Sequence, residues 1–264
     1  MWTTDSAGTA SLGRSALGSW SAGDVLKCAL PHLGPSDRLL LRGLALVASR
    51  HVVSIQGLQH IAPARDPFIL VANHGTMRES ALVPSLLFLS RGGKRIHFLA
   101  DWNYRIWPGI GLMYRRAEVV TVLRKPGRPR ALNFLKAFYA HDHPPRVQAR
   151  MHLAAGRSIG IFPEGQVNPD PERMLRGRHG AARLSLDLGV PVVPMGIRFP
   201  NVASGEPIPG NAPMALHIGA PVLPMKSAGP QASLPDVRAW HAAIMGEVAR
   251  LSGKLWTEEA SRGR

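Results

Sequence analysis

The chain has 264 residues, enough to bury one substantial hydrophobic core, and its 45% hydrophobic and 19% charged residues exclude wholesale disorder. The formal net charge of +15 indicates attraction to polyanions, namely nucleic acid, anionic membranes or phosphorylated substrates, without choosing among them. The single cysteine, Cys28, excludes an intramolecular disulfide and a cysteine-rich zinc site, and we expect a reducing or redox-indifferent compartment.

The sequence was searched for a targeting signal and for a membrane-spanning segment. Residues 1–5 lack the basic start and apolar run of a signal peptide. No stretch reaches the ~18 apolar residues that span a bilayer, so a protein that meets a membrane is expected to lie on its surface. Residues 1–22, rich in Ser, Gly, Ala and Thr, are predicted to be a flexible leader, and residues 23–264 to form one domain.

Strands and helices are predicted to alternate along this domain. In chain order we expect a helix at 39–47, a strand at 51–55, a strand at 68–72, a helix at 79–89, strands at 96–100 and 119–122, helices at 131–140 and 147–155, a strand at 158–162, a helix at 180–188, a strand at 191–197 and a helix at 234–251. This alternation predicts an α/β fold with a mixed, mostly parallel sheet flanked by helices. The apolar face of the last helix is expected to belong to the core.

A histidine and an acid follow the strand predicted at 68–72. His74 comes two residues after that strand, and Glu79 lies five residues further on, across a turn that can fold the carboxylate back onto the imidazole. An imidazole with a pKa near ~6.5 suits a general base, and an acid on its other nitrogen fixes the tautomer. Taken alone, such a pair is more often structural, with His74 capping or hydrogen-bonding the turn.

A second motif, Phe162-Pro163-Glu164-Gly165, ends the strand predicted at 158–162. In an open parallel sheet, ligands bind beyond the carboxyl ends of the strands. We therefore expect this motif and His74 to meet at one edge of the sheet.

Together these motifs resemble the blocks of the glycerophospholipid acyltransferase family, whose bacterial prototype is 1-acylglycerol-3-phosphate acyltransferase. Four blocks occur in the family's order between about residues 70 and 197, and the similarity extends over about 50–222. The first block is similar to the family's His-x4-Asp signature, with Glu79 in the place of Asp, and it implies that His74 is the catalytic base. The fourth, 190–197, is similar to an apolar, proline-rich strand.

The resemblance also implies acceptor-binding residues. Arg124 falls where the family has an arginine that holds the acceptor's phosphate, although a solvated surface arginine is as compatible with the sequence. Glu164 and Gly165 match the family's tetrapeptide, in which Glu164 accepts hydrogen bonds from acceptor hydroxyls or holds arginines. The family's usual Thr-Arg-Ser continuation is replaced by Gln-Val-Asn at 166–168, and Arg178 resembles a downstream family lysine. Compensating arginines are Arg173 and Arg176.

The implied activity is transfer of a fatty acyl group from acyl-CoA or acyl carrier protein to a lysophospholipid hydroxyl, with no metal and no resident cofactor. Backbone amides near the His74 turn are our prediction for the oxyanion donors. We expect a peripheral or monotopic protein on the cytoplasmic face of an anionic membrane, with no nucleic-acid partner. The alternatives are the same chemistry on a non-glycerol lipid or a specialised metabolite, and a non-catalytic basic membrane-binding module.

Overall fold

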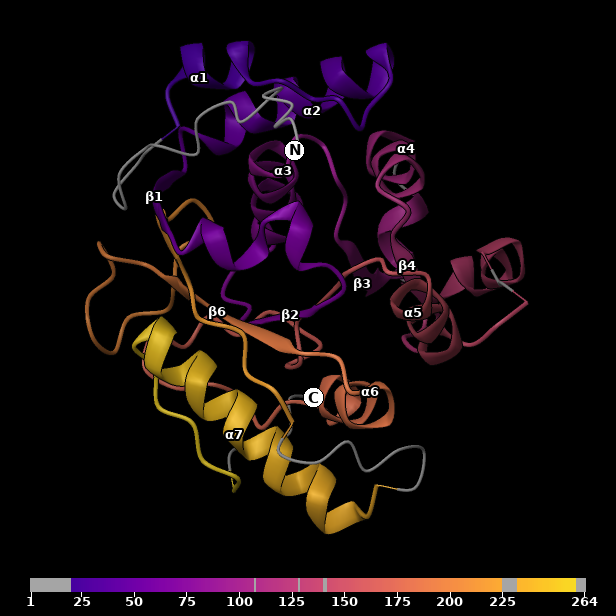
Figure 1. Cartoon of the computed structure of the whole chain (residues 1–264), viewed down its shortest axis with the longest axis vertical. Helices are drawn as coiled ribbons and strands as arrows, with labels where there is room; N and C mark the ends of the chain where they lie inside the picture. The colour runs from indigo at the N-terminus through magenta and orange to yellow at the C-terminus, as the bar shows by residue number, and fades with distance from the viewer. Residues whose placement is uncertain (1–19, 107, 128, 140–141, 225–231, 260–264) are drawn as a thin grey trace, which may run out of the picture.

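A seven-stranded sheet forms the middle layer of the computed structural model, which describes residues 20–106, 108–127, 129–139, 142–224 and 232–259 (Figure 1). The strand order is β1-β7-β6-β2-β5-β3-β4. In chain order the strands are β1 (Val52–Gln56), β2 (Ile69–Ala72), β3 (His97–Asp101), β4 (Val120–Val122), β5 (Ile159–Ile161), β6 (Val192–Arg198) and β7 (Met214–Ile218).

Five neighbouring strands of this sheet run parallel. β6, β2, β5, β3 and β4 pair in parallel, whereas β7 is antiparallel to β6 and itself pairs in parallel with β1. The carboxyl ends of the five parallel strands therefore lie along one edge of the sheet. The predicted α/β fold with a mixed, mostly parallel sheet is confirmed.

Helices cover both faces of the sheet (Figure 1). One face carries α1 (Ala22–Lys27), α2 (Pro35–Ala48), α3 (Glu79–Ser90) and α4 (Pro108–Arg116), and the other carries α5 (Pro145–Ala154), α6 (Gly180–Leu188) and α7 (Leu234–Ser252). The 3₁₀ helices η1 (Leu58–Ile61), η2 (Pro63–Arg65), η3 (Trp102–Ile106) and η4 (Arg130–Tyr139) connect these elements.

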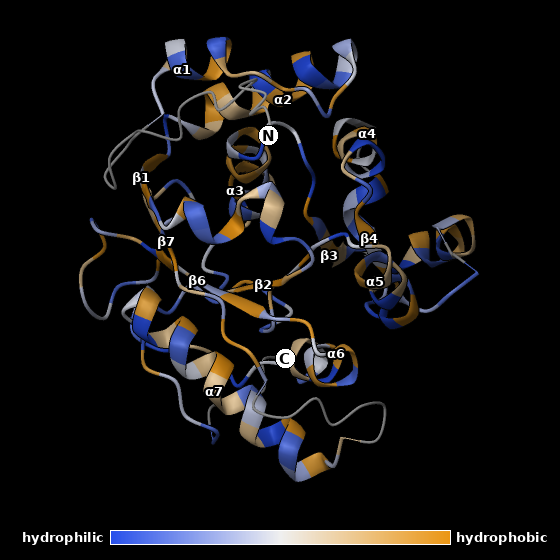
Figure 2. Ribbon diagram, viewed as in Figure 1, coloured by the Kyte–Doolittle hydropathy of each residue, from blue (hydrophilic) through white to orange (hydrophobic). Residues whose placement is uncertain are grey.

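The strand β2 contributes to a hydrophobic core on each side of the sheet. Leu70 and Ala72 pack into the core under α2 and α3, and Ile69 and Val71 pack into the core under α6 and α7. This alternation is the two-residue period of a strand, and burial on both faces explains why 68–72 is apolar throughout. The central strands are accordingly hydrophobic in Figure 2.

A buried ion pair fixes the far end of α3, the helix that begins with Glu79. The Arg91 guanidinium contacts both carboxylate oxygens of Asp66 at 2.8 Å and also donates to the carbonyl of Ile61. Lys94 adds a contact of 2.7 Å to the same carboxylate. Burial lowers the pKa of Arg91 and its bond to Asp66 opposes this shift, so the charge pair satisfies a group that would be costly to bury alone.

Most predicted elements agree with the structure, and four points differ. Segment 131–140 is not the expected α-helix: its described part, 131–139, belongs to the 3₁₀ helix η4. The elements α1, α4 and β7 were not predicted from the sequence. Residues 1–19 of the predicted leader lie outside the described residues, and Ser21 near its end caps α1. Within the described chain, no helix combines the length and apolarity needed to cross a bilayer.

The C-terminal helix α7 packs along β6, the strand next to β2. Val237, Ile244 and Val248 on its inner face are buried in the core, as its apolar periodicity predicted. At its C-terminal end, a Cβ on Gly196 would lie 2.1 Å from the carbonyl carbon of Leu251, so only glycine permits this close approach. The helix is thereby seated on the strand that borders β2.

Candidate active site

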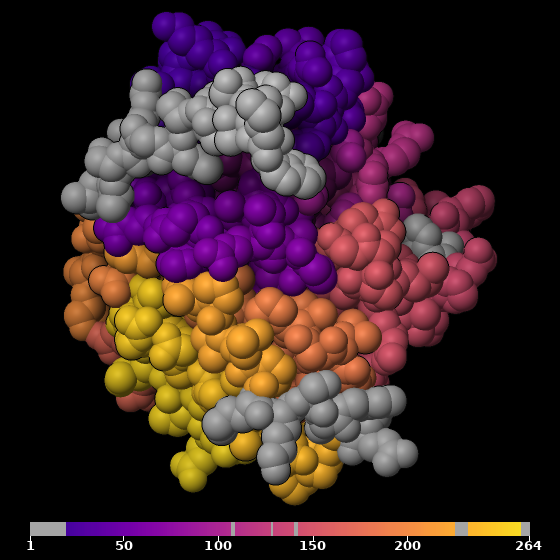
Figure 3. All heavy atoms as spheres, in the orientation of Figure 1, coloured from indigo at the N-terminus to yellow at the C-terminus, as the bar shows by residue number. Residues whose placement is uncertain are grey.

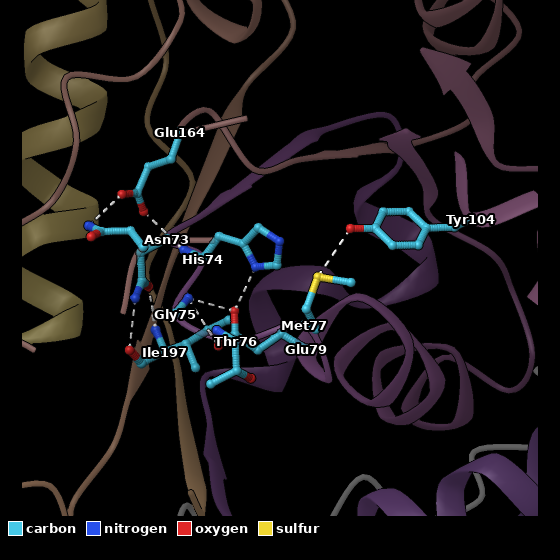
Figure 4. A network of polar contacts seen from close by, with 10 residues as sticks. Asn73, His74, Gly75, Thr76, Met77, Glu79, Tyr104, Glu164 and Ile197 are labelled. Carbon is cyan, nitrogen blue, oxygen red and sulfur yellow. Dashed lines mark hydrogen bonds and ion pairs between the residues drawn. The ribbon is translucent and has the colours of Figure 1, made fainter. Parts of the chain in front are cut away.

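His74 and Glu164 follow the carboxyl ends of two adjacent strands. β2 ends at Ala72 and is followed by Asn73-His74, and its neighbour β5 ends at Ile161 and is followed by Phe162-Pro163-Glu164. The two motifs meet as expected, because the His74 amide donates a hydrogen bond of 3.0 Å to Oε1 of Glu164 (Figure 4).

His74 and Glu79 form a buried pair. Nδ1 of His74 lies 3.0 Å from Oε2 of Glu79, and the Glu79 carboxylate is fully buried at the start of α3. The same carboxylate accepts the amide of Gly75 at 3.0 and 2.9 Å and that of Thr76 at 2.6 Å. An acceptor carboxylate places the ring proton on Nδ1, so Nε2 carries the lone pair. Glu79 has one methylene more than an Asp, and the turn at Gly75 and Thr76 binds its carboxylate through backbone amides in a position that reaches Nδ1 of His74.

Glu164 holds the backbone around His74. Its second oxygen, Oε2, accepts the Asn168 side-chain amide and the Leu175 backbone amide, each at 2.9 Å. Burial raises the pKa of Glu164, and the hydrogen bonds from Leu175, His74 and Asn168 oppose that rise. Both oxygens of Glu164 are therefore engaged by the protein itself.

An apolar pocket opens at His74. The His74 ring stacks on Phe162 with their centroids 4.6 Å apart, and Phe162 in turn stacks on Phe98 at 5.7 Å. The pocket measures about 1190 Å³ with its open mouth included, and α2, α3, β3 and α4 supply most of its lining. His74 is 8% exposed, and its Nε2 is hydrogen-bonded to no residue of the described ranges.

The pocket extends along β3 toward the opposite edge of the sheet. Its lining includes Ala100 near the carboxyl end of β3 and Ile96 before its other end, a span of roughly 13 Å at strand spacing. Charged side chains also line it: Asp37 pairs with Arg95 at 3.0 Å and with Arg116 at 2.5 Å. The geometry offers a long apolar chain a binding site whose one end lies at a histidine-acid pair.

Comparison with known proteins identifies the family of the chain. A family model described as acyltransferase matches residues 52–198, which is more than half of the chain and includes both motifs. The chain belongs to the acyltransferase family. This confirms the resemblance found in the sequence and the expectation of an acyltransferase.

The fold of this acyltransferase is similar to that of PlsC, the 1-acyl-sn-glycerophosphate acyltransferase from Thermotoga maritima. The TM-score is 0.53 with 22% sequence identity, over 88% of this chain and 89% of the other. No curated protein sequence matches the chain at a significant level.

Two predicted arginines of the acyltransferase have different surroundings. Gly165 has a φ of +69°, and a Cβ there would lie 2.8 Å from Nε of Arg178, so the Arg178 side chain packs over this glycine. Gly165 also lines the pocket, which places Arg178 beside it. Arg124, by contrast, is exposed after β4, and its neighbour Lys125 is the residue that lines the pocket.

The two arginines predicted to compensate contact the C-terminal part of the acyltransferase, Arg173 through its backbone and Arg176 through its side chain. Arg173 pairs with Leu255 in an isolated β-bridge, and Arg176 lies 4.0 Å from Glu258. The Arg176 carbonyl accepts Nε2 of His241 at 2.9 Å and Nε1 of Trp256 at 3.2 Å. These contacts hold the segment between Glu164 and Arg178 against α7 and the residues that follow it.

Two asparagines support the turn that carries His74 in the acyltransferase, and neither has a role predicted from the sequence. Asn73 bridges β2 to β6, because its side chain donates to the Ile197 carbonyl at 2.9 Å and accepts the Ile197 amide at 2.7 Å. The backbone amide of Asn168 donates to the His74 carbonyl at 2.7 Å. A polar residue directly before His74 was the one available signal, whereas the Asn168 contact depends on how the loop folds back.

The predicted oxyanion donors are occupied in this conformation. The amides of Gly75 and Thr76 donate to Glu79, and that of His74 donates to Glu164. Since a single N–H satisfies one acceptor well, these three amides are not free to bind an oxyanion. They instead hold the carboxylates that position the imidazole.

Proposed function

We propose that this acyltransferase moves a fatty acyl group from acyl-CoA or acyl carrier protein to the hydroxyl of a lysophospholipid such as 1-acylglycerol-3-phosphate, with His74 as general base. The observation that carries the proposal is the His74–Glu79 pair at the end of an apolar pocket. The acceptor class is extended from PlsC, whose fold is similar. The reaction is proposed to occur at the cytoplasmic membrane face, to which the chain attaches peripherally.

The proposed chemistry is direct transfer without a covalent enzyme intermediate. Nε2 of His74 takes the acceptor's hydroxyl proton as its oxygen attacks the thioester carbon, and the carbonyl π electrons move to the oxygen. The carbon–sulfur bond then breaks, the carbonyl re-forms, and the departing thiolate takes the proton back from the imidazolium. Glu79 stabilises the transient imidazolium through Nδ1. The step uses no metal and no resident cofactor.

The apolar pocket suits the acyl chain of the donor. Its wall contains Leu40, Leu44 and Pro84 and reaches His74, so a chain bound there would place its thioester carbonyl near Nε2. Burial of a hydrocarbon chain contributes about 0.8 kcal/mol per methylene, which is enough to hold the donor while the thioester stays at the opening. Arg178 above Gly165 is proposed to hold the acceptor's phosphate.

The test of the base is His74→Ala. We expect release of free thiol from long-chain acyl-CoA, with 1-acylglycerol-3-phosphate present, to fall by about 10²–10⁴-fold, the usual contribution of a general base. His143→Ala removes an exposed histidine and serves as the matched control. Circular dichroism and thermal unfolding must show both variants folded. Wild-type activity in folded His74→Ala would refute the proposal, as would vesicle binding by the wild type without any thioester consumption.

The test of the acceptor compares Arg178→Ala with Arg124→Ala. Loss of a phosphate contact at Arg178 should raise KM for 1-acylglycerol-3-phosphate about tenfold or more, since charge-assisted bonds are among the strong ones. The rate with monoacylglycerol, which lacks the phosphate, should change little. An effect confined to Arg124→Ala would assign the phosphate to Arg124, and equal losses with both acceptors would count against a phosphate contact.

A further inference from the structure

The 3₁₀ helix η4 exposes two aromatic side chains. Phe134 is 64% exposed and Phe138 is 79% exposed, and η4 buries none of its residues. It extends over ten residues, whereas 3₁₀ helices rarely exceed three or four. Because helices in proteins draw most of their stability from packing of an apolar face, η4 has a face that the described chain leaves without a partner.

The other side of η4 is anchored on η3. The ring centroids of Tyr139 and Trp102 lie 6.1 Å apart, and Nζ of Lys136 lies 5.9 Å from the centre of the Trp102 ring. The Tyr139 hydroxyl reaches the Arg105 carbonyl at 3.5 Å. In Figures 1 and 3 the segment coloured for residues 130–139 lies at the margin of the molecule. These contacts hold η4 against the protein while its phenylalanines remain in solvent.

Segment 119–141, which contains η4, is basic, although its Lys125 lies 3.9 Å from the carboxylate of Asp101. The sequence from 119 to 141 contains no acidic residue, and its five basic residues are Arg124, Lys125, Arg128, Arg130 and Lys136. Arg124 and Arg130 are exposed. A segment that combines exposed Phe with Lys and Arg is the composition of an element that lies in the interface of an anionic bilayer.

This segment is adjacent to the wall of the apolar pocket. Lys125, just before η4, lines the pocket, and its carbonyl accepts Nε1 of Trp102 at 3.0 Å. Tyr104 of η3 also lines the pocket, and its hydroxyl contacts the sulfur of Met77 at 3.1 Å (Figure 4). Met77 itself is 49% exposed, three residues after His74. The 3₁₀ helix η3 thus lies between the turn of His74, which its Tyr104 contacts through Met77, and η4, which packs on its Trp102.

We propose that η4 is a membrane-docking element that inserts Phe134 and Phe138 into the interface of an anionic bilayer, with Arg124 and Arg130 on the lipid headgroups. The inference rests on the proposed function in one respect, because it explains how a pocket whose lining includes Lys125, five residues before η4, meets an acceptor that resides in a membrane. On the bilayer, the two phenylalanines bury the face that the protein leaves exposed, and the adjacent basic residues keep the headgroups close to the pocket.

The test is the double substitution Phe134→Ser/Phe138→Ser. Binding to sedimented vesicles of phosphatidylglycerol should weaken at least about tenfold, since the two buried rings supply most of the apolar area. The matched control, Leu223→Ser/Leu234→Ser, removes two leucines that are 65% and 53% exposed and do not line the pocket, and it should bind as wild type does. Wild-type binding should weaken as salt rises and be poor on phosphatidylcholine.

A second readout separates this inference from the proposed reaction. Thiol release with substrates dispersed in detergent should be unchanged in the phenylalanine variant, whereas its rate on acceptor embedded in phosphatidylglycerol vesicles should fall with its binding. Vesicle binding by the phenylalanine variant equal to that of the wild type would overturn the docking element, as would wild-type binding to duplex DNA but not to vesicles. If no thiol is released in either format and the variant still loses vesicle binding, the proposed reaction fails and the docking element stands.

Discussion

Replacing Glu79 by Gln tests the orientation of the imidazole without changing its surroundings. Oε1 of Glu79 accepts the amides of Gly75 and Thr76 at 3.0 and 2.6 Å, so the amide oxygen of Gln must occupy that position. Its NH₂ group then faces Nδ1 of His74, in place of the oxygen that lies 3.0 Å from it. Two donors cannot face each other, so Nδ1 must become the acceptor and the ring proton must move to Nε2.

The expected loss follows from this change of tautomer. A proton on Nε2 removes the lone pair that faces the pocket, and the equivalent acid-to-amide change in a Ser-His-Asp triad lowers the rate about 10⁴-fold. That factor corresponds to about 5.4 kcal/mol at 1.36 kcal/mol per tenfold. Stability should fall by only about 1–2 kcal/mol, because both backbone bonds to Oε1 persist, while their charge assistance and the second contact of the Gly75 amide, 2.9 Å to Oε2, are lost. Glu79→Ala would leave two buried amides unpaired and is the less informative change.

The assay is thiol release from acyl-CoA with 1-acylglycerol-3-phosphate, measured beside thermal unfolding of each variant. Glu206→Gln makes the same chemical change at an exposed position and should be indistinguishable from wild type. Activity of Glu79→Gln within tenfold of wild type would refute the argument, since the proton could not then be on the nitrogen that faces the substrate.

Two further changes test the turn and a half-buried histidine. A Cβ on Gly75 would lie 2.6 Å from the Phe199 ring and 3.2 Å from Oε1 of Glu79. Gly75→Ala should therefore lower the free energy of unfolding by about 1–3 kcal/mol and the rate at least tenfold. The control Gly246→Ala adds a Cβ to open space in α7 and should lower neither. Burial, followed by the charges of neighbouring groups, lowers the pKa of His152 to about 4. Between pH 6.5 and 4 the unfolded chain binds this proton and the folded chain does not. The free energy of unfolding, measured in urea, should therefore decrease as the pH is lowered through that window, by about 1 kcal/mol once partial exposure is allowed for. His152→Leu should make this pH dependence weaker.

The positions of the two motifs could be predicted because the sequence around them is locally consistent. The apolar segments at 68–72 and 158–162 each stop at a polar, glycine-containing turn, which is how buried parallel strands end. Parallel strands direct their carboxyl ends to one edge, so His74 and Glu164 had to lie at the same edge. Their adjacency, by contrast, required the pairing of β2 with β5, which are separated by two other strands in the chain.

The elements that were missed are those whose formation depends on distant partners. β7 is a short strand between β1 and β6, and its antiparallel pairing with β6 has no local signal. Segment 131–139 has the apolar content of a helix, but the described part of the chain leaves Phe134 and Phe138 on it exposed, and it forms a 3₁₀ helix instead of an α-helix. Local periodicity reports what a segment could bury and cannot report whether the fold offers anything to bury it against.

The sequence by itself determined the fold class, the acyltransferase family and the candidate base, because these depend on residue type, order and strand-to-turn spacing. Only the tertiary structure decided the surroundings of each group: Glu164 binds the His74 backbone, Arg178 covers Gly165, and Arg124 remains exposed. The apolar pocket likewise forms from α2, α3, β3 and α4. Contacts of this kind join residues far apart in the chain, so they depend on the packing of whole elements and leave no mark in any single segment.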